Sequence, residues 1–376
     1  MISRDSKEQI QKRISGPKTI ILLGPRGTGK SALISELEPN FKPPVLWWNG
    51  DNADIRDLLQ GITAARLRPL IGQANTLIIK EAQRIENISQ CLKLISDTFK
   101  QVKVIATGST SFAIADKISE PLTGRKWEFN LFPLSFNEMV NHHGLLEETR
   151  QLNHRLVFGY YPDIVSNPGD EISRLRQMAE HVLYKDILVW ERVLKPEKLE
   201  KLVQTIAWQV GKEVSYYELG KLCDLDNQTV EKYVHLLEKA FIIHNLPSFS
   251  RSLPNELKKS RKLYFYDNGL RNAVINQFNT MENRNDTEAL WENFLINERL
   301  KFTTYQNTEI GRYFWRTHAQ QEIGYVEERS ESLAAYAFKW DAKTKARFPK
   351  AFREAYHPAE TAIITKDNFF DFIGVE

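Results

Sequence analysis

The sequence contains few cysteines and no side-chain pattern that is typical of a metal site. Only two cysteines occur in 376 residues, Cys91 and Cys223, and each lies in a helix-like stretch without metal-ligand spacing. The eight histidines form no i, i+4 pair beside a carboxylate. We therefore expect idle thiols in a reducing compartment and no metal held by protein side chains alone.

Long apolar runs and low-complexity tracts are also absent. Residues 1–18 lack the apolar core of a signal peptide, and no later segment has the unbroken apolar length that a membrane span needs. The sequence thus predicts a cytoplasmic protein without membrane contact. With 42% hydrophobic and 26% charged residues the chain should be folded throughout, and its net charge of +3 permits contact with nucleic acid without requiring it.

The most specific pattern is a glycine-rich loop between a predicted strand and a predicted helix. An apolar run at 19–23 is typical of a buried parallel strand, and helix-forming residues follow at 32–37. Glycines let backbone N–H groups turn toward phosphate oxygens, and the helix start adds partial positive charge. We expect ATP and Mg²⁺ here, with Lys30 at the β and γ phosphates and Ser31 as a Mg²⁺ ligand. The loop shows the complete Walker A pattern: Gly24, Pro25, Arg26, Gly27, Thr28, Gly29, Lys30 and Ser31.

A second strand should end in carboxylates that orient the Mg²⁺ water shell and activate the attacking water. The apolar run at 76–79 is such a strand, but Lys80 occupies the usual aspartate position, before Glu81. An ammonium there repels the metal by roughly 1–4 kcal/mol at a separation of about 4 Å. We therefore expect hydrolysis to be impaired more than binding. Glu81 is the candidate base, and the alternative is a surface glutamate at a helix start.

Three further features are candidates for the nucleotide site. Thr107 and Ser109 follow a predicted strand at 102–106, where a hydroxyl would sense the γ phosphate. Arg125 is a candidate arginine finger across a subunit interface, a role that would require an oligomer, and the alternative is a surface arginine. Trp47 and Trp48 close another strand, as core residues or as adenine-stacking residues.

The middle of the chain indicates helices and then a DNA-reading module. A helical pattern covers 171–210, and predicted helices at 214–223 and 228–240 precede a hairpin that starts at 241–243. This order is typical of a helix-turn-helix with a wing. The alternative is a protein-docking module with a solvated basic turn, so the partner is double-stranded DNA or a protein client. The candidate DNA contacts are Gln228, Thr229, Lys232 and Tyr233 at the groove, and Lys258, Lys259 and Arg261 at phosphates.

The last third predicts an α/β unit in which a nuclease site is incomplete. An amphipathic helix at 288–300 precedes alternating segments around 313–316, 323–326 and 334–340. A restriction-endonuclease type of site needs acids on the helix and on two strands, with a lysine near the attacking water. Glu292 and Lys339 are present, but Gly324 and Ala337 stand at the other acidic positions. Nuclease activity is therefore not expected.

Taken in order, these segments resemble a family of predicted bacterial and archaeal AAA+ ATPases with a C-terminal domain of uncharacterised function. The resemblance covers nearly the whole chain and implies an ATPase fold, a winged helix and a nuclease-like terminal domain. Family members usually have aspartate at the position of Lys80 and acids at those of Gly324 and Ala337, so their replacement indicates a catalytically weakened member. The similar segments are 24–31, 77–83, 106–109, 122–125, 132–138, 161–162, 264–270 and 291–293.

Together these patterns predict an α/β chain of three parts. The parts are an AAA+ type P-loop NTPase with a parallel sheet at 1–140, a helical and winged-helix region at 141–250, and a restriction-endonuclease-like α/β domain, expected to be inactive, at 251–376. The predicted function is ATP binding by a possibly weakened ATPase that couples nucleotide state to domain arrangement. The alternative is a non-hydrolysing nucleic-acid-binding or docking protein in which ATP is a structural ligand.

Overall fold

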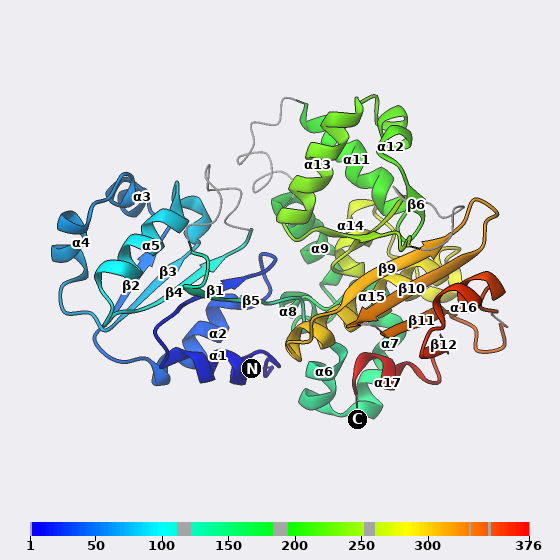
Figure 1. The fold of residues 1–376 in the computed structure, drawn as a ribbon, viewed down its shortest axis with the longest axis horizontal. Helices are drawn as coiled ribbons and strands as arrows, with labels where there is room; N and C mark the ends of the chain where they lie inside the picture. The colour runs from blue at the N-terminus through cyan, green and yellow to red at the C-terminus, as the bar shows by residue number, and fades with distance from the viewer. Residues whose placement is uncertain are drawn as a thin grey trace. The chain divides into compact units, whose positions relative to one another are not determined.

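A computed structural model of the chain describes residues 2–110, 122–182, 195–251, 260–330, 332–344 and 347–375. The chain forms two compact units: unit 1 is Met1–Pro133 with Lys239–Phe241, and unit 2 is Leu134–Glu238 with Ile242–Glu376. In Figure 1 the chain up to Pro133 runs from blue to blue-green, and unit 2 follows in green to red. The division into three domains that the sequence suggests stays a prediction.

Unit 1 is built on a parallel five-stranded sheet in the order β2-β3-β4-β1-β5. The expected strands at 19–23 and 76–79 are confirmed, and their apolar residues are buried as in a parallel sheet covered on both faces. Because the strands are parallel, the loops after β1, β3 and β4 leave one edge of the sheet side by side. The strands are β1 (Thr19–Leu23), β2 (Val45–Asn49), β3 (Thr76–Lys80), β4 (Lys103–Gly108) and β5 (Lys126–Asn130).

Helices complete unit 1, and the core joins the first two of them to the sheet. Ile10 and Ile14 belong to one buried cluster with Ile34, Leu22 and Ile105. The helix before β1 is therefore an integral part of this unit. The helices are α1 (Lys7–Ile14), α2 (Lys30–Leu37), α3 (Ala53–Leu59), α4 (Ala64–Ile71) and α5 (Ile88–Thr98), with short 3-10 turns η1 (Glu38–Asn40) and η2 (Ala82–Arg84).

Unit 2 begins with helices. The helical pattern at 171–210 is confirmed in its described parts by α9 and α11. Within the described ranges, no helix combines the length and apolar character needed to cross a bilayer. The helices are α6 (Phe136–His143), α7 (Leu145–Phe158), α8 (Pro162–Val165), α9 (Glu171–Glu180), α11 (Pro196–Trp208) and, farther along the chain, α14 (Asn268–Val274) and the 3-10 turn η5 (Met281–Asn283).

A small antiparallel sheet follows α11, in the order β6-β8-β7. Its strands are β6 (Glu213–Val214), β7 (Ile243–Pro247) and β8 (Arg261–Phe265), and α12 (Tyr216–Cys223) and α13 (Asn227–Lys239) lie between β6 and β7 in the chain. The expectation of a helix from residue 214 is wrong at its start. Val214 pairs with Arg261 in the sheet, and the Ser215 hydroxyl accepts the Glu218 N–H, which caps α12 at Tyr216.

The C-terminal part has a mixed four-stranded sheet in the order β12-β11-β10-β9. β10 is antiparallel to β9 and β11, and β12 is parallel to β11. The predicted arrangement of a helix followed by strands is confirmed (Figure 1). The elements are α15 (Thr287–Tyr305), β9 (Gly311–Arg316), β10 (Glu322–Arg329), β11 (Ser332–Phe338), α16 (Lys350–Tyr356), β12 (Glu360–Ile364) and α17 (Phe369–Ile373).

Helix α15 is not the one-sided amphipathic helix that the sequence predicts. It is buried along most of its length, and its buried residues include polar and charged ones. Such groups are stable in a core only when they are paired. Arg299 forms two hydrogen bonds of 2.7 and 2.8 Å with the carboxylate of Glu327 on β10. The polar side of α15 therefore faces partners on other elements rather than water.

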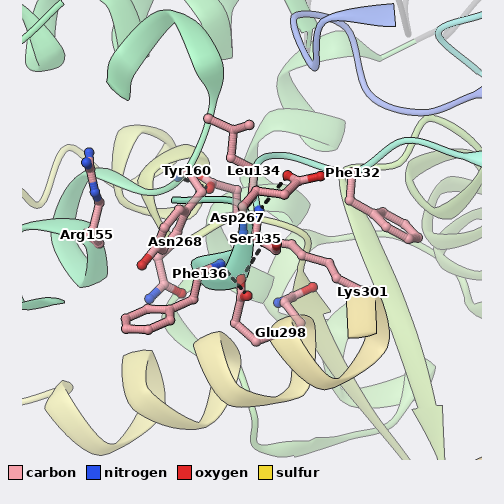
Figure 2. Close-up of polar contacts among 12 residues, drawn as sticks. Phe132, Leu134, Ser135, Phe136, Arg155, Tyr160, Asp267, Asn268, Glu298 and Lys301 are labelled. Atoms are coloured by element: carbon pink, nitrogen blue, oxygen red, sulfur yellow. Dashed lines mark hydrogen bonds and ion pairs between the residues drawn. The ribbon is translucent and has the colours of Figure 1, made fainter. Parts of the chain in front are cut away.

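The first residues of unit 2 are held by another buried pair of α15. Lys301 Nζ lies 2.6 Å from Glu298 Oε1 and donates to the Leu134 carbonyl at 2.8 Å. Glu298 Oε2 accepts the Phe136 N–H at 2.7 Å (Figure 2). A capping box between Ser135 and Glu138 fixes the same turn at the start of α6. The segment 134–136, which follows unit 1 directly in the chain, is thus attached to the centre of unit 2.

Replacing Lys301 by Met should strongly destabilise the protein. Glu298 would keep its buried charge without a cation, so the free energy of unfolding should fall by about 3–5 kcal/mol. Urea denaturation of the full chain measures this change.

The matched control is Lys350→Met. Lys350 forms a 3.3 Å pair with Glu354, and both side chains are exposed, so its loss should cost less than about 1 kcal/mol. Equal effects of the two substitutions would contradict the structural role assigned to the buried pair.

Candidate nucleotide site

The loop at 24–31 leaves β1 and enters α2 with a backbone that only glycine adopts readily. Gly24, Gly27 and Gly29 have φ of 149°, 82° and 90°. A Cβ on Gly24 would also lie 2.0 Å from the Leu131 carbonyl oxygen, where no side chain fits. Both the conformation of the loop and its close approach to the backbone after β5 therefore depend on glycine.

The side chain of Lys30 lies inside this loop. It is 6% exposed, and Nζ donates to the carbonyls of Gly24 at 2.7 Å and Pro25 at 2.8 Å. The Thr28 hydroxyl donates to the same Pro25 carbonyl at 2.9 Å, while Ser31 is exposed on the first turn of α2. α2 begins at Lys30, and its N-cap residue Gly29 provides no side-chain cap. A buried ammonium and an uncapped helix start are what a phosphate group requires, so the loop fits a nucleotide.

Arg4 is part of the site, although nothing in the sequence pointed to it. It is 7% exposed and donates to the Thr28 carbonyl in the loop at 2.5 Å and to the Phe132 carbonyl at 2.6 Å. One guanidinium therefore joins the phosphate-binding loop to the last residues of unit 1. No periodicity or motif marks Arg4, because both of its partners are backbone carbonyls distant in sequence.

The residues after β3 separate into two environments. Lys80 Nζ lies 4.7 Å from the centre of the Trp47 ring on β2, a cation–π contact that holds the ammonium beside the edge strand. This contact gives Trp47 a role that neither sequence interpretation included. Glu81 has φ of 45°, and a Cβ on Gly50 would lie 2.3 Å from its carbonyl oxygen. The turn after β3 is therefore tightly packed against the end of β2.

Glu81 and Ser109, which were separate sequence candidates, lie together. Gln83 Nε2 donates to Glu81 Oε2 and to Ser109 Oγ, both at 2.8 Å, and Ser109 Oγ lies 3.3 Å from the same carboxylate oxygen. Thr107 is buried beside Leu22 in the register of β1 and β4, near the start of the loop. Gln83 is the residue that sequence reasoning missed in this cluster.

Arg125 directly precedes β5 and lies at the end of the strands opposite to the glycine loop. Its carbonyl accepts the N–H of Thr19 at the start of β1, and its Nε lies 3.0 Å from Asp97 Oδ1. The five residues of β1 separate it from the loop of its own chain, a span of about 16 Å. A role as arginine finger would therefore require a neighbouring subunit, and it stays a prediction.

The DNA-contact candidates have different surroundings. Gln228 and Lys232 are exposed on α13, whereas Tyr233 is buried and cannot contact a groove. The Thr229 hydroxyl donates to Asp226 at 2.6 Å and so belongs to the start of the helix. Arg261 is hydrogen-bonded to the Tyr216 hydroxyl and lies over its ring. Lys258 and Lys259 lie outside the described residues.

Comparisons with known proteins match three stretches of the chain. Residues 16–140 match a family described as "AAA domain", residues 149–281 a domain of unknown function (DUF8612), and residues 287–372 a domain of unknown function (DUF4143). An uncharacterized protein of Haemophilus influenzae is 24% identical over 316 residues, 75% of this chain and 77% of that protein. An uncharacterized protein of Mycobacterium tuberculosis is 23% identical over 329 residues, 86% of this chain and 71% of that protein.

Solved structures resemble the chain only distantly. The Thermotoga maritima RuvB Holliday junction branch migration motor aligns with 65% of this chain and 90% of its own, at 16% identity and a TM-score of 0.30. The Pif1 helicase from Candida albicans aligns with 47% of this chain and 48% of its own, at 14% identity and a TM-score of 0.28. Likeness at this level supports no statement about this chain.

The parallel sheet, the glycine loop and the AAA-domain match define a nucleotide-binding protein of the ATPase type. Within that class, the chain resembles AAA ATPases that carry a C-terminal DUF4143 domain, since residues 16–140 match the first model and residues 287–372 the second.

Proposed function

We propose that this protein binds ATP with Mg²⁺ through residues 24–31, hydrolyses it slowly, and uses nucleotide state to set the arrangement of its parts. The observation that carries the proposal is the buried Lys30 ammonium inside a loop that only glycines can form. In this proposal Lys30 contacts the β and γ phosphates, the loop amides cradle them, and the Ser31 hydroxyl holds Mg²⁺. Bound Mg²⁺ would neutralise phosphate charge.

We infer slow ATP hydrolysis from the residue at the end of β3, which is Lys80. Lys80 provides no carboxylate for the Mg²⁺ water shell, but its contact with Trp47 favours an ammonium that stays beside β2. That contact would moderate the repulsion of the metal. Glu81 remains the candidate base, and Gln83 and Ser109 would keep its carboxylate oriented toward the attacking water. Thr107 is then a second polar group near the γ phosphate.

The Lys80→Asp variant should hydrolyse ATP about tenfold faster than the parent or more, since it restores a carboxylate and removes a positive charge. Glu81→Gln should lower turnover by about a hundredfold. ATP affinity, measured by calorimetry beside steady-state hydrolysis, should change little in either variant.

Lys80→Ala is the control for this comparison, because it removes the ammonium without adding a carboxylate and should not give the full gain. Equal turnover in the parent and Lys80→Asp would show that the lysine is tolerated. Absence of ATP binding by the parent would overturn the proposal as a whole.

Arg4 is the residue that we assign to coupling. It contacts the loop at Thr28 and the backbone at Phe132, and residue 134 is already attached to α15 through Lys301. A shift of the Thr28 carbonyl on nucleotide binding would change the hydrogen bond that Arg4 donates to it. The backbone that leads into unit 2 would respond through the chain itself.

In the parent, ATP should alter amide hydrogen exchange at residues 134–138, and Arg4→Met should abolish this response while ATP affinity stays of the same order. Hydrogen exchange followed by mass spectrometry measures the response. The matched control is Arg13→Met, which removes an arginine that lies over the Trp127 ring in the same unit. An unchanged response in Arg4→Met would exclude this route of coupling.

A second candidate function is nucleic-acid binding. The order α11-β6-α12-α13-β7-β8, with the sheet order β6-β8-β7, supports the proposal of a helix-turn-helix with a wing. Gln228 and Lys232 are exposed on the second helix, where a recognition helix would meet a groove. In this alternative, ATP is a structural ligand and the winged helix binds duplex DNA or a protein client.

If this region binds DNA, the parent should retard duplex DNA at low salt, and Lys232→Glu should weaken the binding. The slope of log affinity against log salt should fall by about one if Lys232 pairs with a single phosphate. Lys201→Glu on α11 is the matched surface control. No retardation by the parent at low salt would count against DNA and favour a protein client.

A further inference from the structure

The incomplete nuclease-like centre of the C-terminal part contains a lysine that comes from the small sheet. Gly324 lies next to Glu292, since a Cβ at position 324 would be 3.9 Å from Glu292 Oε2. The sequence-based assignment of these two positions to one site therefore agrees with their proximity, and the acid expected at 324 is missing. The other carboxylate oxygen of Glu292, Oε1, lies 3.2 Å from Nζ of Lys262 on β8.

Lys262 is shared by two carboxylates. Its Nζ also lies 2.7 Å from Glu322 Oε1 at the start of β10, and the residue is 3% exposed. The Tyr264 hydroxyl donates to Glu292 Oε1 at 2.5 Å. Burial alone would lower the pKa of Lys262, but the two carboxylates outweigh burial and raise the pKa. The lysine is therefore charged at neutral pH.

A divalent cation does not fit this centre. Mg²⁺ needs six oxygen ligands at about 2.0–2.1 Å, usually with one or two carboxylates and several waters. Here Gly324 and Ala337 provide no carboxylate, and an ammonium already contacts both Glu292 and Glu322. In the described part of the chain, no group of three or more acidic, histidine or cysteine side chains is placed to hold a metal.

A second ion pair connects the same two sheets. Arg316 on β9 lies 2.7 Å from Glu213 on β6 and 3.8 Å from Glu322. Lys262 and Arg316 thus alternate with Glu213, Glu322 and Glu292 across the junction between the small sheet and the four-stranded sheet. All of these contacts lie within unit 2.

We propose that Lys262 takes the position of the divalent cation in this centre. The centre then contains no metal, and its ion pairs connect the small sheet to the terminal sheet. The ammonium neutralises Glu292 and Glu322 as a bound cation would, but it is covalently part of β8. The orientation of the predicted DNA-reading helices on the terminal domain is then fixed by this chain alone.

Metal rescue tests the proposal on the full chain without nucleotide. MnCl₂ should leave the thermal midpoint of the parent unchanged, and no Mn²⁺ should bind in a titration followed by electron paramagnetic resonance. Lys262→Ala leaves the half-buried Glu292 without this cation and Glu322 with the more distant Arg316, and its midpoint should fall by about 5 °C. MnCl₂ should recover part of this loss, and the added substitution Glu292→Gln should abolish the recovery.

Two results would overturn the proposal. One is Mn²⁺ binding by the nucleotide-free parent that Glu292→Gln removes, which would show that the centre is a metal site despite Lys262. The other is a Lys262→Ala protein that folds but gains nothing from Mn²⁺. The titration of the parent needs no variant, so the proposal stays testable even where Lys262→Ala does not fold.

Discussion

Charged groups buried along α15 must be paired, and most of unit 2 is arranged around this constraint. Glu292 meets Lys262 of the small sheet, Arg299 meets Glu327 of the terminal sheet, and Glu298 with Lys301 binds the segment that follows unit 1. Glu298 and Lys301 are both on α15 and reach the segment through hydrogen bonds to its backbone, whereas the other two pairs join α15 to the two sheets. Because a buried charge without a partner costs several kcal/mol, these elements have only one favourable arrangement around the helix.

The nucleotide site depends on a different constraint, which is close approach of backbone to backbone. Gly24 touches Leu131, and Gly50 touches the turn at Glu81, so the loops after β1, β2, β3 and β5 pack without intervening side chains. This packing holds the backbone from which Lys30 and Glu81 project. Lys80 is accommodated in another way, because its ammonium lies over the Trp47 ring on the neighbouring strand β2.

Much of unit 1 could be predicted from the sequence, because its signals are local. Apolar runs predict β1 and β3, and the glycine spacing of 24–31 predicts both the loop conformation and phosphate binding. Arg4 could not be predicted, since its partners are carbonyls 24 and 128 positions away. The same holds for Lys262, which meets Glu292 across 30 positions, and for α15, whose polar residues look solvent-facing until their partners are known.

The pairing on α15 also constrains how such a sequence can evolve. Replacement of Glu327 alone passes through a protein in which the buried Arg299 has lost its carboxylate partner, whereas a paired exchange retains neutrality. A coordinated double substitution is therefore the less costly way to change these two positions. Exposed pairs such as Lys350 with Glu354 are free to change one residue at a time.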